Sequence, residues 1–328
     1  MKHAPIHCNE IYCGFAEHLL DQLGASSIAL SVWSPPYNVG KDYEKCQSHE
    51  AWREMLCAVI AKHFRVIKPG GFMIVNIADI LCFPDPKMPK IQLPNPSKHR
   101  STITREQVLA AKEKFPDYNR NQLAAYLGCS EQTVDRRVNG NNIRGGKYHT
   151  QTRVQLVGNV IQDFANEAGL YLYDRRIWKK DPAWQNSQWH SSSYRAVDEF
   201  EYVYIFWKPG ETIIDRNRIS KDEWVEWGSR GVWEFRSVRS NDSHEAMFPK
   251  ELPSRCIRLF TAPNDIVLDP FMGSGTTAVA AIESGRRFIG FDKEMKYVDL
   301  ARKRIEREIS QPNLFQLSKQ VIWPEAQI

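Results

Sequence analysis

The sequence predicts an α/β protein whose single, mostly parallel sheet is interrupted by an inserted helical module. Two strand and helix alternations, at residues 28–78 and 265–309, carry the first part of this prediction, because parallel strands need a crossover helix between them. A block with five prolines in fifteen positions, 84–98, follows the first alternation and favours an extended excursion out of the sheet. We therefore expect one sheet domain formed by 1–83 and 151–328, with an insert at 84–150.

The first alternation opens with an apolar strand at 28–33. Residues 48–71 then carry apolar side chains at helical spacing, and the helix is predicted to end at Pro69 and Gly70 before a second strand at 72–78. After the insert, helical spacing returns at 154–169. Strands are predicted at 170–178 and 200–207, a helix at 249–260, a strand at 265–269, a helix at 276–285, a strand at 287–292 and a helix at 295–309. In this last helix Arg304 and Glu308 are spaced as a solvated i,i+4 pair.

The composition is that of an ordinary soluble protein, with 42% hydrophobic and 25% charged residues. No apolar stretch approaches the roughly eighteen residues that a membrane span requires, and the N-terminus lacks the apolar core of a signal peptide, so we expect a cytoplasmic protein without membrane contact. The seven cysteines form no C-x-x-C pair and no cluster at metal-ligand spacing, which predicts reduced thiols and no metal site. A net charge of +5 permits a polyanionic partner.

The stretch "DIVLDPFMGSGTTAVAA" (265–281) is the strongest local signal. Its strand ends at Asp269, and Gly273 and Gly275 allow positive φ and close backbone approach before a helix begins at Thr276. A phosphate-binding P-loop needs a lysine before the threonine, and none is present. The next strand ends at Asp292, where an acidic residue is placed to bind ribose hydroxyls. The alternative is a tight connection whose glycines only relieve crowding.

The first strand ends abruptly in "SPPY" (34–37). Proline cannot donate to a ladder and pushes the preceding residue into extended geometry, so the motif is either a hard stop or a rigid shelf at the carboxyl end of the strand, where open α/β sheets bind ligands.

Together, "SPPYN" (34–38) and "DPFMGSGTT" (269–277) resemble the signatures of the β group of DNA amino-methyltransferases that use S-adenosylmethionine. In this permuted group the catalytic half precedes the cofactor half. Further similarities are "VIKPGG" (66–71), "RRIWKK" (175–180), "HEAMFPKELPSRCIRLF" (244–260) and the run from Gly290 to Arg304. The resemblance implies a Rossmann-like class I methyltransferase sheet, mostly parallel with one antiparallel strand and circularly permuted.

The resemblance also implies how the cofactor is bound. The expected cofactor-binding residues are Asp269, Pro270, Phe271, Gly273, Ser274, Gly275, Thr276, Asp292, Phe248 and Glu10. Glu10 is a departure, because the family usually has Gly-Asp where this chain has Asn9 and Glu10; a plain surface carboxylate is the alternative.

The same resemblance assigns catalysis to Ser34, Pro35, Pro36 and Tyr37. The target base leaves the stack, its amine donates to the Pro35 carbonyl and the Ser34 side chain, and Tyr37 stacks on it. Serine before Pro-Pro is similar to enzymes that methylate cytosine N4, whereas aspartate or asparagine there is similar to those that methylate adenine N6. A hydroxyl accepts less strongly than a carboxylate, which leaves the base open. Methylation of the cytosine ring carbon is set aside, because it needs a nucleophilic cysteine after a proline and none follows one here.

The residue pattern of the insert at 119–140 is typical of a helix-turn-helix, with Gly128 at the turn and Ser130 as the N-cap of the second helix. This favours a target-recognition module that reads double-stranded DNA, helped by the variable segment 208–247. The expected DNA-binding residues are Gln132, Asp135, Arg136, Arg137, Arg144 and Lys147. A helical hairpin that packs on the sheet or contacts a protein is the alternative.

The leading hypothesis is a site-specific DNA methyltransferase acting on cytosine N4 within a restriction-modification system, with a cognate endonuclease as a further partner. Methylation of adenine N6 is the first alternative. A helix-turn-helix regulator with a non-catalytic methyltransferase fold is another, and an enzyme acting on RNA or protein amines is a third. The sequence leaves open a monomer or a homodimer.

Overall fold

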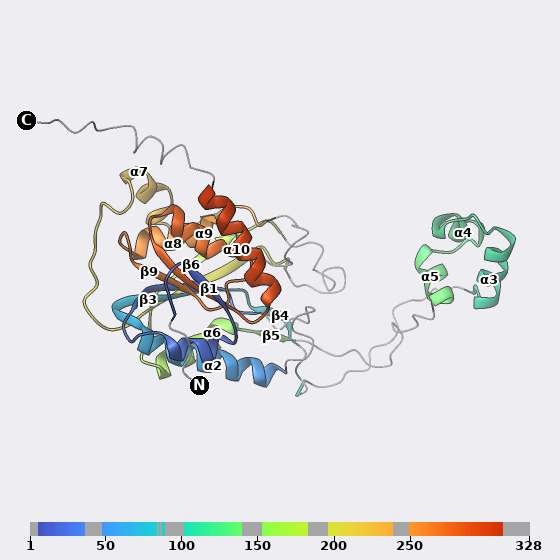
Figure 1. The fold of residues 1–328 in the computed structure, drawn as a ribbon. Helices are drawn as coiled ribbons and strands as arrows, with labels where there is room; N and C mark the ends of the chain where they lie inside the picture. The colour runs from blue at the N-terminus through green and yellow to red at the C-terminus, as the bar shows by residue number, and fades with distance from the viewer. Residues whose placement is uncertain are drawn as a thin grey trace, which may run out of the picture. The chain divides into compact units, whose positions relative to one another are not determined.

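The computed structural model describes residues 6–36, 48–83, 85, 87, 88, 102–139, 153–182, 196–238 and 249–310. They form an eight-stranded sheet of order β1-β10-β9-β2-β3-β7-β6-β8 (Figure 1). Within this sheet β7 is antiparallel to both its neighbours, and the other pairings are parallel. The prediction of a mostly parallel sheet with one reversed strand is confirmed. The strands are β1 (Glu10–Cys13), β2 (Ile28–Trp33), β3 (Ile67–Ile77), β6 (Tyr171–Lys179), β7 (Phe200–Trp207), β8 (Val232–Glu234), β9 (Ile266–Asp269) and β10 (Arg287–Asp292).

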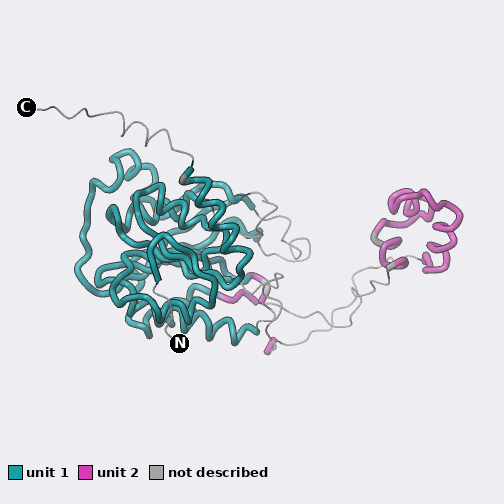
Figure 2. Tube along the Cα trace, viewed as in Figure 1, with its two compact units in different colours: residues 1–80, 156–328 teal, residues 81–155 magenta. Residues whose placement is uncertain are grey.

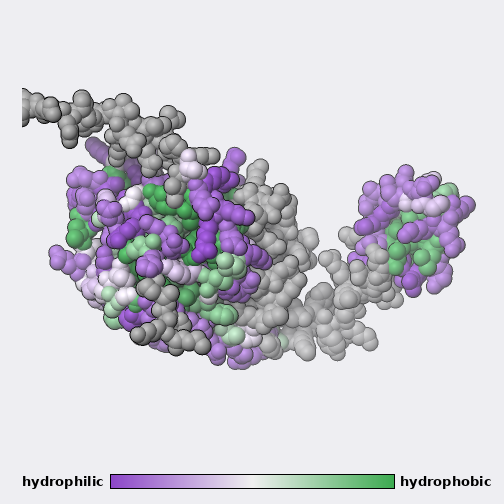
Figure 3. Space-filling view, in the orientation of Figure 1, coloured by the Kyte–Doolittle hydropathy of each residue, from purple (hydrophilic) through white to green (hydrophobic). Residues whose placement is uncertain are grey.

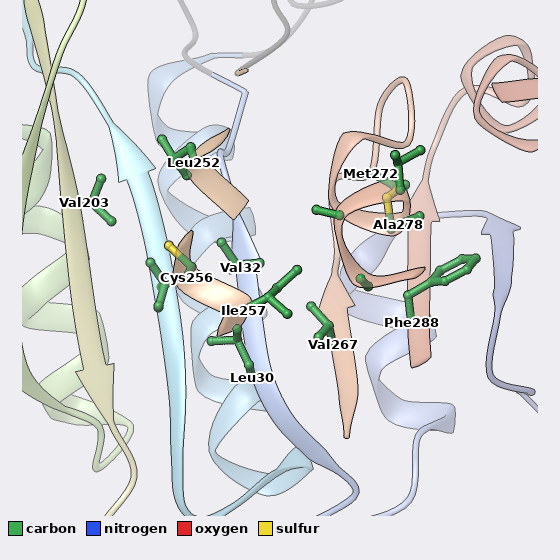
Figure 4. Packing of buried hydrophobic residues seen from close by; sticks show 14 of the residues in the cluster. Leu30, Val32, Val203, Leu252, Cys256, Ile257, Val267, Met272, Ala278 and Phe288 are labelled. Carbon is green, nitrogen blue, oxygen red and sulfur yellow. The ribbon is translucent and has the colours of Figure 1, made fainter. Parts of the chain in front are cut away.

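Helices cover both faces of the sheet. One face carries α1 (Ala16–Leu19), α2 (His49–Val66) and α6 (Val157–Glu167), and the other carries α8 (Glu251–Phe260), α9 (Thr276–Glu283) and α10 (Met295–Ser310). Because side chains alternate along a strand, β2 serves both layers: Leu30 and Val32 pack beneath α8 (Figure 4), whereas Trp33 packs toward α2. Short elements complete the domain: a 3-10 turn (Leu20–Gln22), α7 (Lys221–Glu223) and a π-helical turn (Trp224–Gly228).

The boundary between α2 and β3 differs from the prediction. The helix ends at Val66 and the strand begins at Ile67, so Pro69 and Gly70 belong to the strand and do not terminate the helix. Gly70 has φ +78°, and a Cβ there would lie 1.9 Å from the Glu211 carbonyl oxygen. The glycine therefore permits close approach of a neighbouring backbone. The helix predicted at 154–169 is also shorter, because β5 (Arg153–Gln155) precedes α6.

The chain divides into two compact units, residues 1–80 with 156–328, and residues 81–155 (Figure 2). The second unit contains α3 (Arg105–Lys114), α4 (Arg120–Tyr126) and α5 (Glu131–Asn139), and β4 (Ile80–Phe83) pairs with β5. Its small core contains Val108, Ala111, Leu123, Ala124 and Val134. No helix in the described part of either unit is long and apolar enough to cross a membrane.

Candidate active site

The two motifs leave the sheet side by side. β2 pairs in parallel with β9, with Ser31 opposite Leu268, so Ser34–Pro36 and the turn after Asp269 emerge at the same carboxyl edge. From this point α2 leads from β2 to β3 over one face, while α9 leads from β9 to β10 over the other. The chain thus turns in opposite directions from two adjoining strands, and such a switch point is where open α/β sheets bind ligands.

The contact between the two motifs is aromatic. The rings of Trp33 and Phe271 have centroids 5.4 Å apart, and Trp33 is fully buried. Beneath them, the Ser31 hydroxyl lies 2.9 Å from His63 Nε2 on α2 and 3.2 Å from the Leu268 carbonyl oxygen on β9. These contacts fix the relative positions of the two strand ends.

The proline shelf, Ser34–Pro36, follows directly on β2. Pro35 is buried, and the Pro36 carbonyl accepts a 2.6 Å hydrogen bond from the indole nitrogen of Trp52. In the described part of the chain the Pro35 carbonyl accepts no hydrogen bond. Tyr37 lies outside the described residues.

The glycine turn spans Asp269 to Thr276. Gly273 and Gly275 have φ values of +51° and +83°, a region that L side chains rarely adopt. A Cβ on Gly275 would lie 3.0 Å from the Ala301 Cβ, so α10 packs directly against the turn. Gly275 is also the N-cap of α9, whose first backbone N–H groups point back toward the carboxyl edge.

Two carboxylates shape this turn. Asp269 is buried and accepts hydrogen bonds from the Phe271 backbone nitrogen at 2.9 Å and from the Thr277 hydroxyl at 2.5 Å. Asp292 accepts from the Gly273 nitrogen and from the Glu294 nitrogen, both at 2.9 Å. Burial raises the pKa of Asp269 to about 7 and raises the pKa of Asp292. Each oxygen of Asp292 has a second lone pair, so the carboxylate can hold the turn and still accept from a ribose.

The predicted cofactor residues fall into three groups. The structure brings Asp269 through Thr276 together with Asp292. Glu10 is not brought to them: it is exposed at the amino end of β1, opposite Ile289, three residues before the end of its strand, which is about 10 Å at the rise of a parallel strand. Phe248 lies outside the described residues.

Arg304 contributes to the site in a way that the sequence did not suggest. Its guanidinium donates to the Ser274 carbonyl at 3.3 Å and to the Thr276 hydroxyl at 3.1 Å. The predicted solvated role for this residue is therefore wrong, although the outward face of α10 is indeed hydrophilic (Figure 3). The sequence feature that could have indicated this role is the run from Gly290 to Arg304, which resembles the family. The i,i+4 spacing of its charges pointed elsewhere.

The expected DNA-binding residues lie in the second unit. Asp135, Arg136 and Arg137 are on α5, which begins after a turn with Gly128 at φ +64°, and the Ser130 hydroxyl accepts from the Thr133 nitrogen. Arg136 is exposed, whereas the Asp135 carboxylate lies 3.5 Å from Arg120 on α4. Gln132 belongs to α5 by its backbone, and Arg144 and Lys147 lie outside the described residues.

The variable segment, 208–247, uses its main aromatic residues for packing. Trp227 and Trp233 are buried, and the Arg255 guanidinium of α8 lies 5.2 Å and 5.6 Å from their ring centroids. Such cation–π contacts attach the segment to the sheet domain. Trp224, in contrast, is exposed.

The residues at this site fit S-adenosylmethionine. The turn offers glycine backbone with no lysine for a phosphate, next to a carboxylate placed for a ribose. Combined with a proline shelf on the adjoining strand, this arrangement is that of a DNA amino-methyltransferase dependent on S-adenosylmethionine. Residues 28–303 match the DNA methylase family N6_N4_Mtase, and the chain belongs to that family. The resemblance inferred from the sequence is thereby confirmed.

A relative supports this assignment, and two solved structures share the fold. The Type II methyltransferase M.BglI of Bacillus subtilis is 59% identical over 305 residues, which is 93% of this chain and 88% of that protein. The fold resembles TTHA0409 of Thermus thermophilus, complexed with S-adenosyl-L-methionine (TM-score 0.59, 23% identity, 93% of this chain and 95% of that one). It also resembles the PvuII DNA methyltransferase, described as cytosine-N4-specific (TM-score 0.59, 18% identity, 92% and 89%).

Proposed function

We propose that this DNA methyltransferase methylates N4 of cytosine in double-stranded DNA. The observation that carries the proposal is the emergence of Ser34–Pro36 and the glycine turn at adjoining strand ends. The choice of cytosine over adenine rests on Ser34, since serine before Pro-Pro is similar to the cytosine-N4 enzymes of the family. Adenine N6 is the alternative.

The chemistry follows from the weakness of the nucleophile. The lone pair of an aromatic amine is delocalised into its ring, so acceptors that hold both amine hydrogens favour the tetrahedral nitrogen that can attack. Pro35 supplies a carbonyl without a partner in the described residues, Ser34 supplies a hydroxyl oxygen, and Tyr37 stacks on the flipped base. S-adenosylmethionine, held by Gly273, Gly275 and Asp292, supplies the methyl group when bound. Transfer would leave the cofactor as a neutral thioether, and the methylated nitrogen would release one of the hydrogens that the acceptors held as a proton to solvent.

The test is mass spectrometry of nucleosides from DNA incubated with the enzyme and S-adenosylmethionine. We expect N4-methylcytosine, and Tyr37→Ala should lower its rate of formation by roughly 100-fold while cofactor affinity persists, because the role proposed for the ring is stacking on the base. Appearance of N6-methyladenine alone would replace the cytosine assignment with the alternative. Loss of cofactor binding in Tyr37→Ala would show that the base pocket is wrongly placed.

We further propose that the second unit reads the target sequence. It has its own core and an exposed arginine on α5, Arg136, at the position from which a recognition helix reaches base edges. Replacing residues 100–146 with a short linker should abolish sequence preference in a methylation assay. Arg136→Ala should relax preference at one or two base pairs, whereas Lys112→Ala, on the exposed face of α3, should weaken binding equally for all sequences. Unchanged preference in the deletion variant would exclude this role.

A cognate restriction endonuclease is the remaining partner that we propose, since M.BglI carries the description of a Type II methyltransferase. Genomic DNA from cells expressing this chain should resist one enzyme of a panel of type II endonucleases. Cleavage by every member of a panel that covers the methylated sequence would count against this partner.

A further inference from the structure

The first turn of α2 makes direct contact with the proline shelf. Trp52 is fully buried, and its indole nitrogen donates to the Pro36 carbonyl oxygen at 2.6 Å. The helix begins at His49, where the Ser48 hydroxyl caps it by accepting from the Ala51 nitrogen. The donor therefore belongs to the first turn of a capped helix. Because the indole has only two side-chain torsions, its nitrogen is held in a defined position.

The two prolines of the shelf can be held by hydrogen bonds in only one way. Two of its three residues are prolines and have no backbone N–H, so hydrogen bonds can hold the prolines only through their carbonyls. The Pro36 carbonyl is occupied by Trp52, and the Pro35 carbonyl has no partner in the described residues. Adjacent carbonyls thus differ in availability. The bound carbonyl of Pro36 is joined to the peptide that follows Pro35 through a φ angle that the proline ring fixes.

A second contact joins α2 to β2. His63 lies eleven residues after Trp52, about three helical turns later and so on the same helix face. Its Nδ1 lies 2.7 Å from the Val59 carbonyl and its Nε2 lies 2.9 Å from the Ser31 hydroxyl. A carbonyl only accepts, so Nδ1 carries the hydrogen and Nε2 is left as an acceptor. The single hydroxyl hydrogen of Ser31 is therefore shared between Nε2 and the Leu268 carbonyl oxygen at 3.2 Å. The helix is therefore tied to the strand below the shelf as well as to the shelf itself.

We propose that Trp52 is a positioning residue for methyl transfer: by holding the Pro36 carbonyl it orients the preceding peptide, so that the Pro35 carbonyl faces the target amine. This inference rests on the proposed role of Pro35 and goes beyond it, since it assigns the placement of that carbonyl to one indole on a neighbouring helix. Trp52 touches neither base nor cofactor in this account.

The test is Trp52→Phe, which keeps an aromatic ring in the core but has no donor. The matched control is Trp207→Phe. The Trp207 indole donates to the Thr212 hydroxyl at 2.9 Å, and it lies at the carboxyl end of β7, which is the opposite edge of the sheet because β7 runs antiparallel. Transfer of labelled methyl groups to DNA is measured without regard to the base, and enzyme is counted by stoichiometric cofactor binding so that only folded protein contributes.

We expect kcat of Trp52→Phe to fall about tenfold, with KM for DNA and Kd for S-adenosylmethionine within twofold of wild type, because a misaligned acceptor weakens the transition state but not binding. Trp207→Phe should keep wild-type kcat with a similar loss of melting temperature. Wild-type kcat in Trp52→Phe, or an equal fall in both variants, would overturn the inference. If phenylalanine prevents folding, Trp52→Leu, which also lacks a donor, is compared in the same way. A wrong base assignment appears in the nucleoside spectrum and leaves these ratios unaffected, so the two failures are distinguishable.

Discussion

Gly273→Val should abolish binding of S-adenosylmethionine, raising Kd by 100-fold or more in isothermal titration. The residue has φ +51°, where a β-branched side chain is strained, and its N–H donates to Asp292. The added side chain would also stand where, in the proposed site, the cofactor approaches the backbone. Methylation activity should disappear in parallel.

Gly285→Val is the matched control. Gly285 also has a left-handed φ, +70°, and lies after the other end of α9 with no atom within 4 Å of an added Cβ. Both variants carry the cost of placing valine in this region and should lose melting temperature, but only Gly273→Val should lose the cofactor. Equal loss of affinity in both would show that the effect is one of folding and not of a binding turn.

The free energy of unfolding should fall as pH rises from about 4 to about 7, and Asp269→Asn should remove the part of this dependence that Asp269 contributes. Asp292, whose pKa is also raised by burial, contributes in wild type and variant alike. Burial raises the pKa of Asp269 to about 7, so between these pH values the folded protein holds a proton that the unfolded chain has released, and stability decreases with pH. Above pH 7 the difference is complete and is on the order of 4 kcal/mol for a shift of this size. Asparagine can still accept from Phe271 and donate to Thr277.

Urea unfolding of the cofactor-free protein between pH 4 and pH 8 measures this effect. Asp299→Asn, on the exposed face of α10, removes the same charge and serves as the control. The gain in stability of Asp269→Asn over wild type should grow with pH, while the control should follow wild type. A gain in stability that is constant across the pH range would contradict a raised pKa of the buried Asp269 carboxyl.

The sheet and its motif-bearing strand ends were predictable because their signals are local. Strands are predicted by the apolar run before Ser34 and by the run before Asp269. Both strands lie at the switch point of the sheet. The boundary at Gly70 was not predictable, because the reason for that glycine is the backbone of Glu211, far along the chain.

The support of the site was less accessible to sequence reasoning. Trp52 matches the helical spacing of a core residue, and nothing in that spacing distinguishes packing from a hydrogen bond to a distant carbonyl. For Glu10 the sequence predicted more than the structure supports. The residue was expected to bind the cofactor, but the pairing of β1 with β10 places it away from the glycine turn.

The short pairing of β4 with β5 has a consequence for how such enzymes change specificity. Where the chain enters and leaves the second unit, the two strands join, Arg153 bonds Asp85 at 2.6 Å, and its guanidinium lies 5.0 Å from the Phe83 ring centroid. Because the ends of the insert are held together in this way, lengthening the insert adds little entropy cost. On the proposed role of the second unit as the target reader, a different unit can be inserted between these two strands while the methyltransferase unit is left unchanged.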